Sequence, residues 1–380
     1  MTISRRKSLG LLAGGTALLG AACSAENASA PLADLGKPIT APPRTPPTPG
    51  VRATSLKDYY RNNFKFGMAG QTFQMGENDP EASIIAAHFN SITAEYQMKP
   101  DQISPAEGVY NFDAADQIVD FAVANGMDVR GHALLWHQTT PDYFLTGSNA
   151  QIKRKLENYI GTVVDRYKDR VYCWDVVNEV VAQSFEPANQ IYRISNWSEA
   201  VGGQQYIDWA FNAAREADPN CLLCFNDYST EDPGKRVKYM TVLEDLLARG
   251  IPVDVAGHQM HINMDTPIAQ MRAAIDDVDG LFAGLENHVT ELDMSFYNDP
   301  GSCWERQAGC DADVGPNPPY AMLELQARRY KEIFNMFVSR SSVSSVTMWG
   351  LDDGQSWLNG LPVQRSNHPL LFDRDLNPKM

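Results

Sequence analysis

Two glutamates stand at the ends of two short apolar runs, and they are the residues of this chain best suited to chemistry. Glu179 ends the run that begins at Trp174, and Glu291 follows Val289 and Thr290 in the other. Such valine-rich runs are typical of strands buried on both faces of a parallel sheet, where a carboxylate must be paired or take part in a reaction. Two facing carboxylates can cleave a glycosidic bond, one as proton donor and one as the anion beneath the anomeric carbon.

The residues near each glutamate suggest separate tasks. Side chains two positions apart on a strand point the same way, so Glu291 and Asp293 face one side and His261 could contact both. An imidazole held there would keep Glu291 ionised, as a nucleophile must be, and Glu179, beside Asn178, would act as the acid and later the base. The alternative for either glutamate alone is a structural ion pair, but two at predicted strand ends favour catalysis.

The elements that must position these groups alternate between strand and helix. Alternation implies parallel strands joined by crossovers, and eight such units close into a (β/α)8 TIM barrel. An open doubly wound sheet is the competing architecture, but no glycine-rich nucleotide-binding motif follows an early strand. The predicted strands are 64–69, 91–98, 129–137, 171–178, 222–226, 253–261, 288–294 and 345–351, and predicted helices include 113–124, 150–167, 205–217, 234–249, 267–277 and 321–337.

In a barrel of this kind the chemistry lies at the carboxyl ends of the strands. Indole rings near carboxylates favour the stacking of sugar rings over simple packing. We do not expect a zinc site, because no carboxylate accompanies the histidines at metal-ligand spacing. The predicted strand ends carry Glu95 and Lys99, His132 and Trp136, Asn178 and Glu179, Asn226 and Asp227, Gln259 and His261, Glu291 and Asp293, and Trp349, with Trp357 close behind.

The charge and the N-terminal segment indicate an exported protein with a lightly charged ligand. A net charge of −15 argues against nucleic acid or an anionic membrane as partner. Residues 1–30, with Arg5 and Arg6 before a short apolar stretch, resemble a twin-arginine export signal; cleavage could fall before Cys23, giving a lipid anchor, or after Ala30. A proline-rich linker (31–53) and one barrel domain (54–380) follow. We expect a periplasmic protein, an outer-membrane lipoprotein or a secreted protein.

Export makes a disulfide plausible. Cys303 and Cys310 flank a short loop, and we predict that they are bridged. Cys221 and Cys224 lie in an apolar run with no second pair at zinc spacing, so we interpret them, and Cys173, as core residues.

At this point the motifs resemble family 10 of the glycoside hydrolases, the endo-1,4-β-xylanases, from about residue 64 to residue 379. The resemblance implies a (β/α)8 barrel and a retaining double displacement without a cofactor or metal. It also implies xylan and xylo-oligosaccharides as ligands, and we expect the protein to be a monomer. The motifs are W-D-V-V-N-E (174–179), T-E-L-D (290–293), G-H-x-L-x-W-H (131–137), N-S-x-T-x-E-x-x-M-K (90–99), H-Q-M-H (258–261) and W-G-x-x-D-x-x-S-W (349–357).

Carried over residue by residue, the resemblance implies a role for each site residue. Glu179 would be the acid/base and Glu291 the nucleophile, supported by His261 and Asp293, and Asn178 would hold the 2-hydroxyl of the sugar being cleaved. The remaining side chains would bind sugar rings: Lys99, His132, Trp136 and Gln259 at that same sugar, Glu95 and Lys99 at the next one, Trp349 and Trp357 as an apolar wall, and Tyr228 on the leaving side.

Four departures from the family pattern stand out. Tyr96 replaces a usual asparagine, and Pro100 and Tyr143 replace usual tryptophans, so the glycone side looks altered. The chain ends at Met380, before the family's last helix, so we expect that helix to be missing and its seat on the barrel uncovered.

Two rival hypotheses remain open. A related barrel glycosidase acting on glucan or on mixed substrates would be favoured if Tyr96 and Tyr143 admit a hydroxymethyl group. A catalytically silent xylan-binding lipoprotein would agree with Cys23, but the presence of Glu179 and Glu291 argues against it.

Overall fold

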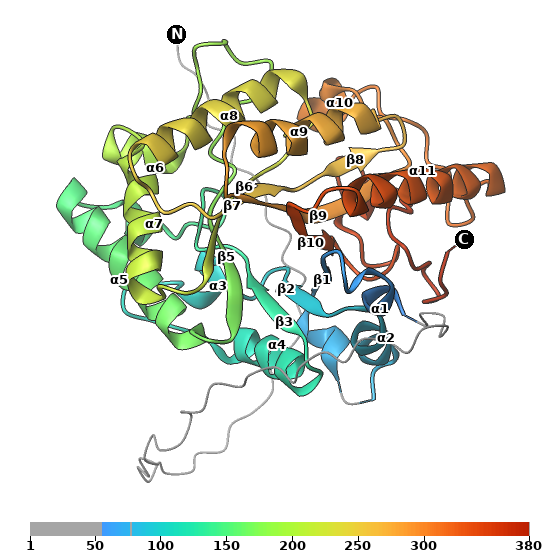
Figure 1. Ribbon diagram of the computed structural model, residues 1–380, viewed down its shortest axis with the longest axis horizontal. Coiled ribbons are helices and arrows are strands. Elements are labelled where there is room, and N and C mark those ends of the chain that lie inside the picture. The colour runs from blue at the N-terminus through green and yellow to red at the C-terminus, as the bar shows by residue number, and fades with distance from the viewer. Residues whose placement is uncertain (1–54, 77, 380) are drawn as a thin grey trace, which may run out of the picture. The chain divides into compact units, whose positions relative to one another are not determined.

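Eight parallel strands close into a barrel in the computed structural model, which describes residues 55–76 and 78–379 (Figure 1). Helices surround the strands, and β10 pairs with both β1 and β9, which closes the ring. The predicted (β/α)8 architecture is thus confirmed, whereas the predicted export signal and linker lie outside the described residues. The ring consists of β1 (Lys65–Gly70), β2 (Ser91–Ala94), β3 (Asp128–Gly131), β5 (Val171–Asn178), β6 (Leu222–Asp227), β7 (Val255–His258), β9 (Glu286–Ser295) and β10 (Val343–Met348).

Four predicted strands extend too far, among them the eighth, which ends at Met348, so that Trp349 lies just beyond it. The second ends at Ala94, so Glu95 follows the strand directly, but Lys99 lies beyond it as the N-cap residue of α3 (Pro100–Ile103). The third and sixth are each interrupted, and their outer parts form the short strands β4 (Leu135–Trp136) and β8 (His261–Asn263), which pair with β5 and β9. An apolar run shows where the chain is buried, but not where its backbone leaves the sheet.

The long helices follow the predicted periodicity. In α5 (Asn149–Tyr167) the buried side chains recur every three or four residues, and a capping box between Ser148 and Gln151 starts the helix. Proline stands at the first position of α2 (Pro80–His88) and of α8 (Pro233–Ala248), where its missing N–H is tolerated. The other helices are α1 (Leu56–Tyr60), α4 (Asp113–Ala124), α6 (Asn196–Val201), α7 (Gln205–Ala217), α9 (Ile268–Leu281), α10 (Gly301–Arg306) and α11 (Tyr320–Val338), with 3-10 helices η1 (Thr72–Met75), η2 (Asp142–Leu145) and η3 (Trp357–Asn359).

One glycine is required where β3 meets β5. A Cβ atom on Gly131 would lie 2.1 Å from Cε3 of the buried Trp174 ring, its register partner on β5. Only a residue without a side chain lets this indole lie flat against the end of β3. Gly131 and Trp174 belong to two of the motifs noted above. The Trp174 ring can take this position only if residue 131 is glycine, so the two motifs depend on each other.

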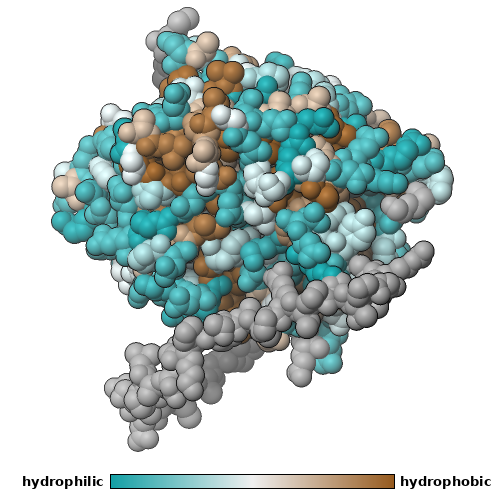
Figure 2. Space-filling model, viewed as in Figure 1, coloured by the Kyte–Doolittle hydropathy of each residue, from teal (hydrophilic) through white to brown (hydrophobic). Residues whose placement is uncertain are grey.

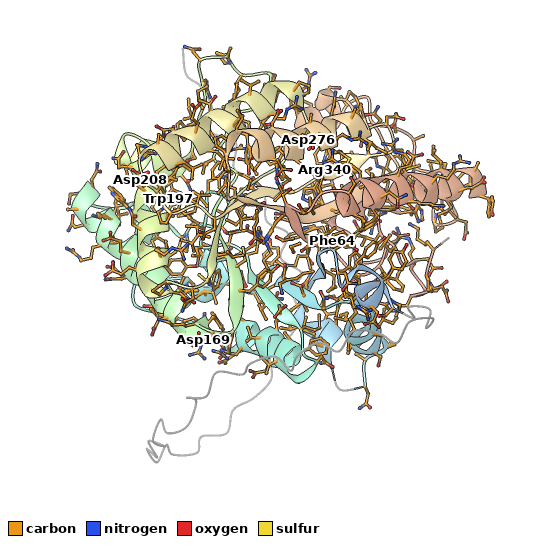
Figure 3. The ribbon with its side chains drawn as sticks, viewed as in Figure 1. Phe64, Asp169, Trp197, Asp208, Asp276 and Arg340 are labelled. Atoms are coloured by element: carbon orange, nitrogen blue, oxygen red, sulfur yellow. A yellow bond between two sulfur atoms is a disulfide. The ribbon has the colours of Figure 1, made fainter. Side chains whose placement is uncertain are left out.

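The face of the molecule seen in Figure 2 is largely polar, with hydrophobic side chains in smaller patches. Ion pairs connect neighbouring helices, as between Asp276 on α9 and Arg340 after α11 (Nε to Oδ1, 2.7 Å; Figure 3). Among the described helices, none has both the length and the apolar composition of a membrane span.

The described residues after β10, up to Lys379, form η3 and loops and contain no α-helix. A cavity of about 230 Å³ lies beside this segment and is lined mainly by apolar side chains of α1, α11 and the C-terminal segment, among them Leu56, Leu323, Tyr330, Leu371 and Phe372.

Candidate active site

Glu291 and Asp293 project from β9 toward one imidazole. His261, at the start of β8, lies with Nε2 3.2 Å from Oε2 of Glu291 and with Nδ1 3.0 Å from Oδ2 of Asp293. The indole of Trp357 donates a hydrogen bond of 2.8 Å to the same Asp293 oxygen. The predicted bridge through His261 is therefore confirmed. Its cause is the alternation of side chains along β9, which β8 follows in register.

These contacts determine the ionisation of Glu291. Burial alone would raise its pKa, but the hydrogen bond with His261 and the positive potential of His132 and His261 outweigh burial and hold the pKa below its ordinary value. Burial likewise opposes a charge on His261, yet the charge and hydrogen bond of Asp293, with those of Glu291, raise the histidine's pKa to about 10. At neutral pH the site therefore contains an ionised Glu291 beside an imidazolium.

Glu179 follows the last residue of β5 in an unusual conformation. Its φ is 62°, in the left-handed region that residues with side chains seldom adopt, and its N–H donates to the carbonyl of Asn226 (2.9 Å). The amides of Asn178 and Gln259 donate to its Oε1 over 3.2 and 3.3 Å. The kink thus turns the side chain of Glu179 into the amide network of the site.

The surroundings of Glu179 favour its protonated form. Burial raises the pKa of this carboxyl, and the negative charge of Asp227 raises it further. Asp227 forms an ion pair with Lys235 (2.6 Å) and accepts the backbone N–H of Val181 (2.9 Å). The pKa values of Glu179 and Glu291 are thus moved in opposite directions, which is the arrangement that separates an acid from an anion.

Asn226 connects the two glutamates, although we did not single it out as a functional residue from the sequence. Its Nδ2 donates to Oδ1 of Asn178 and to Oε1 of Glu291, each over 2.9 Å, and Thr290 donates to its Oδ1 (2.7 Å). In the sequence, this role is indicated by the position of Asn226 at the end of a predicted strand. Its role as a bridge depends on β6 lying between β5 and β7.

A buried charged pair beneath the site was missed altogether. Arg130 on β3 binds both carboxylate oxygens of Asp175 on β5, and Asp175 contacts Nδ1 of His132 over 2.9 Å. Burial opposes ionisation of Asp175, but the charge of Arg130 and the hydrogen bonds keep its pKa below the usual range. His132 Nδ1 in turn lies 4.0 Å from Oε1 of Glu291. In the sequence, this pair is indicated by a charged side chain inside an apolar run.

On one side of the glutamates lie Glu95, Lys99 and Trp136. The Lys99 ammonium lies over the rings of Tyr96 (4.5 Å) and Trp136 (4.6 Å), and Gln71 donates to Glu95 over 2.8 Å. Burial lowers the pKa of Lys99, an effect that the charges of Glu291 and Glu95 oppose. These polar groups next to two aromatic faces suit the hydroxyls and the apolar face of a sugar.

Aromatic rings line the rest of the site. Trp349 contacts His132 edge-on (centroids 5.2 Å apart), and Trp357 contacts His261 (5.1 Å). On the other side of Glu179, Arg193 donates to the Tyr228 hydroxyl over 2.7 Å. The same arginine donates to the Glu179 carbonyl (2.7 Å), so it orders both residues.

Two of the unusual residues have structural roles here. The Tyr143 hydroxyl lies 2.8 Å from Oγ of Ser104, and its ring stacks on Phe144 (4.1 Å). Pro100 is buried at the first position of α3, where proline fits well. Tyr96, in contrast, is half-exposed beside Lys99. Of these three substituted residues, Tyr96 is the most exposed.

The six cysteines of the chain include two that are bridged in the structure. Cys303 and Cys310 form a disulfide with a Cα–Cα distance of 5.0 Å. Cys173, Cys221 and Cys224 are free and buried, as predicted for core residues. Cys23, the sixth, lies outside the described part of the chain.

The chain is similar to a known protein family and to proteins of solved structure. The model of the family "Glycosyl hydrolase family 10" matches residues 55–380, which includes every site residue described above.

Several characterised relatives are similar over most of their length. Endo-1,4-beta-xylanase B of Paenibacillus barcinonensis is 42% identical over 334 residues, covering 86% of this chain and 95% of that protein. A thermostable celloxylanase of Thermoclostridium stercorarium is 39% identical, covering 86% and 85%. Among solved structures, xylanase B of Clostridium stercorarium F9 is 39% identical with a TM-score of 0.77 (86% and 97% covered), and a mutant in complex with xylotriose is 36% identical with a TM-score of 0.79 (86% and 97% covered).

Proposed function

This chain belongs to glycosyl hydrolase family 10, and from that membership we propose that it is an exported endo-1,4-β-xylanase that cleaves internal bonds of xylan by a retaining double displacement. Relatives that carry the name endo-1,4-beta-xylanase, and a structural neighbour bound to xylotriose, support the substrate. The observation that carries the mechanism is that one network of amides holds Glu179 and Glu291, whose surroundings shift their pKa values in opposite directions.

In the first step, Glu291 attacks the anomeric carbon while Glu179 gives its proton to the glycosidic oxygen. The C–O bond to the leaving sugar breaks, and a covalent ester between the sugar and Glu291 forms. The imidazolium of His261 stabilises the ionised form of Glu291 before attack, and burial favours the protonated form of Glu179 by raising its pKa.

In the second step, Glu179 is an anion and accepts a proton from a water molecule. The water oxygen attacks the anomeric carbon, the ester bond breaks, and Glu291 leaves as a carboxylate. Two inversions give net retention. The step restores the protonated Glu179 and the ionised Glu291, so the cycle needs no other reactant.

Asn178 has two tasks in this mechanism: it donates a hydrogen bond to Glu179 and it binds the substrate. Its Oδ1 accepts from Asn226 and Gln259, so its amide is oriented from both sides. A fixed amide beside the acid can hold the 2-hydroxyl of the sugar at the cleavage site, where contacts strengthen in the transition state. Trp136, the register partner of Asn178, contacts Lys99 and His132, and these three side chains bind the same sugar.

Export is supported by the twin-arginine pattern and by the cysteine bridge, which persists in an oxidising compartment. A mixed xylan and glucan substrate is the second candidate, because one relative carries the name celloxylanase and Tyr96 takes an exposed place beside Lys99.

Two measurements test the proposal. Hydrolysis of linear xylan should far exceed that of cellulose or mixed-linkage glucan, and comparable rates on glucan would favour the second candidate. Proton NMR of the first products should show the β-anomer, and an α-anomer appearing first would rule out the double displacement.

A further inference from the structure

Trp304 extends the aromatic wall of the site outward. It lies on α10, about half exposed (49%), and its ring centroid is 6.0 Å from that of Trp357. Trp357 in turn contacts His261 and donates to Asp293. A continuous line of aromatic rings therefore runs from the imidazole beside the nucleophile to an indole that faces solvent.

The segment that carries Trp304 is fixed at both ends. The disulfide joins Cys303, the residue before Trp304, to Cys310. Asp299 accepts the backbone N–H of Asp311 over 3.1 Å, which closes the same loop a second time.

The side chain of Arg365, in the loop after β10, stabilises this closed loop. Arg365 forms a buried ion pair with Asp299 and donates to the carbonyl of Asp311 over 2.8 Å, while its guanidinium stacks on Tyr297 (3.6 Å). The loops after β9 and β10 thus form one rigid unit, and Trp304 and Trp357 keep their relative positions.

A rigid exposed indole is well suited to binding a ring. A single exposed aromatic residue on a protein surface needs no explanation, and Tyr59 on α1 is an example. Trp304 differs because the disulfide and the ion pair restrain the backbone of its segment and because its ring contacts Trp357 in the wall of the site. A preorganised flat face binds a sugar ring without the entropy cost of ordering a mobile side chain.

We propose that Trp304 is a further specificity-determining residue, which stacks on a pyranose ring of bound xylan beyond the rings that Trp349 and Trp357 contact. This inference rests on the proposed function. The ring belongs either to the xylan backbone or to a sugar branch on it. Cys303 and Cys310 act as positioning residues for this indole.

The test compares long with short substrates in the full-length protein. For Trp304→Ala, we expect the ratio of kcat/KM for xylohexaose to that for xylotriose to fall roughly three- to tenfold, as for the loss of one aromatic contact, through a higher KM for the long substrate. Trp304→Phe should recover part of the loss. Tyr59→Ala, the matched control, should leave the ratio unchanged.

Branched substrates separate the two sources of the ring. If the ratio changes for linear xylo-oligosaccharides, Trp304 contacts the backbone; if it changes only for glucuronoxylan or arabinoxylan fragments relative to linear ones, it contacts a branch. The double variant Cys303→Ser, Cys310→Ser should raise KM for the same long or branched substrates while kcat changes little. A melting curve for each variant confirms that it is folded.

Two failures are distinguishable. A wild-type protein that hydrolyses neither xylan nor xylo-oligosaccharides overturns the proposed function. An active wild-type protein whose ratios stay the same in Trp304→Ala for every substrate overturns the inference about Trp304 alone.

Discussion

The side-chain amide of Asn226 donates a hydrogen bond of 2.9 Å to Oε1 of Glu291. It also donates to Asn178, which donates to Glu179, so a chain of amides connects the proposed nucleophile with the proposed acid. The bond stabilises the ionised carboxylate and orients it. The acid and the anion are therefore positioned by one shared network.

Removal of the Asn226 amide should slow catalysis without unfolding the protein. For Asn226→Ala we expect kcat to fall on the order of 10²-fold, because one preorganised donor to the reacting carboxylate is lost. Steady-state kinetics on xylan measure the effect. Asn158→Ala, on the outer face of α5, is the control and should behave as wild type. An unchanged kcat in Asn226→Ala would show that the bridge is dispensable.

Replacement of the proposed nucleophile should abolish turnover and spare binding. Glu291→Ala should lower kcat on the order of 10⁴-fold or more, while calorimetric titration with xylotriose still detects binding. Glu286→Ala, at the start of the same strand and partly exposed, should remain active. Substantial residual turnover in Glu291→Ala would assign the nucleophile elsewhere.

The pH profile of kcat/KM should have two limbs with opposite causes. Glu291 must be ionised, so activity is lost as the pH falls through its lowered pKa; Glu179 must be protonated, so activity is lost as the pH rises through its raised pKa. His261→Gln removes the positive charge of the imidazolium, which helps to lower the pKa of Glu291, and should move the acidic limb to higher pH. His88→Gln, on α2, should not move it. An acidic limb that stays in place in His261→Gln would contradict this role of His261.

Lys235 should contribute strongly to stability. It is buried against Asp227, so Lys235→Met leaves a buried carboxylate without its partner, and we expect a loss of about 3–5 kcal/mol in the free energy of unfolding. Arg236→Met, the next residue on α8, breaks a pair with the exposed Asp277 and should cost less than about 1 kcal/mol. Urea denaturation compares the two, and equal losses would mean that burial of the pair is unimportant.

Gly131 should tolerate no side chain. Gly131→Ala places a methyl group against the buried ring of Trp174 and should destabilise the protein by roughly 1–3 kcal/mol or more. Gly161→Ala is the matched control: nothing lies within 4 Å of the added atom in the interior of α5, so it should stabilise the helix by about 1 kcal/mol. Thermal melts should show a lower Tm for Gly131→Ala and a higher Tm for Gly161→Ala. An unchanged Tm for Gly131→Ala would disprove the steric argument.

The barrel and most of its polar rim could be predicted from the amino-acid sequence alone. The helices α4 and α7 and the strand β5 begin and end where the periodicity predicts, because the burial of one face imposes that spacing directly. The pairing of Glu291 and Asp293 on one face followed from the alternation of side chains along a strand. The resemblance to a known family then supplied roles that spacing alone could not.

The groups that control those roles could not be predicted, because they come together only when the chain folds. Asn226 joins the glutamates because β6 lies beside β5, and Arg130 reaches Asp175 across two strands that are far apart in sequence. Trp304 meets Trp357 because Arg365 connects the loops after β9 and β10. Contacts of this kind depend on closure of the barrel. The periodicity of a sequence reports how each segment is buried, but it does not report which distant side chain will lie against it.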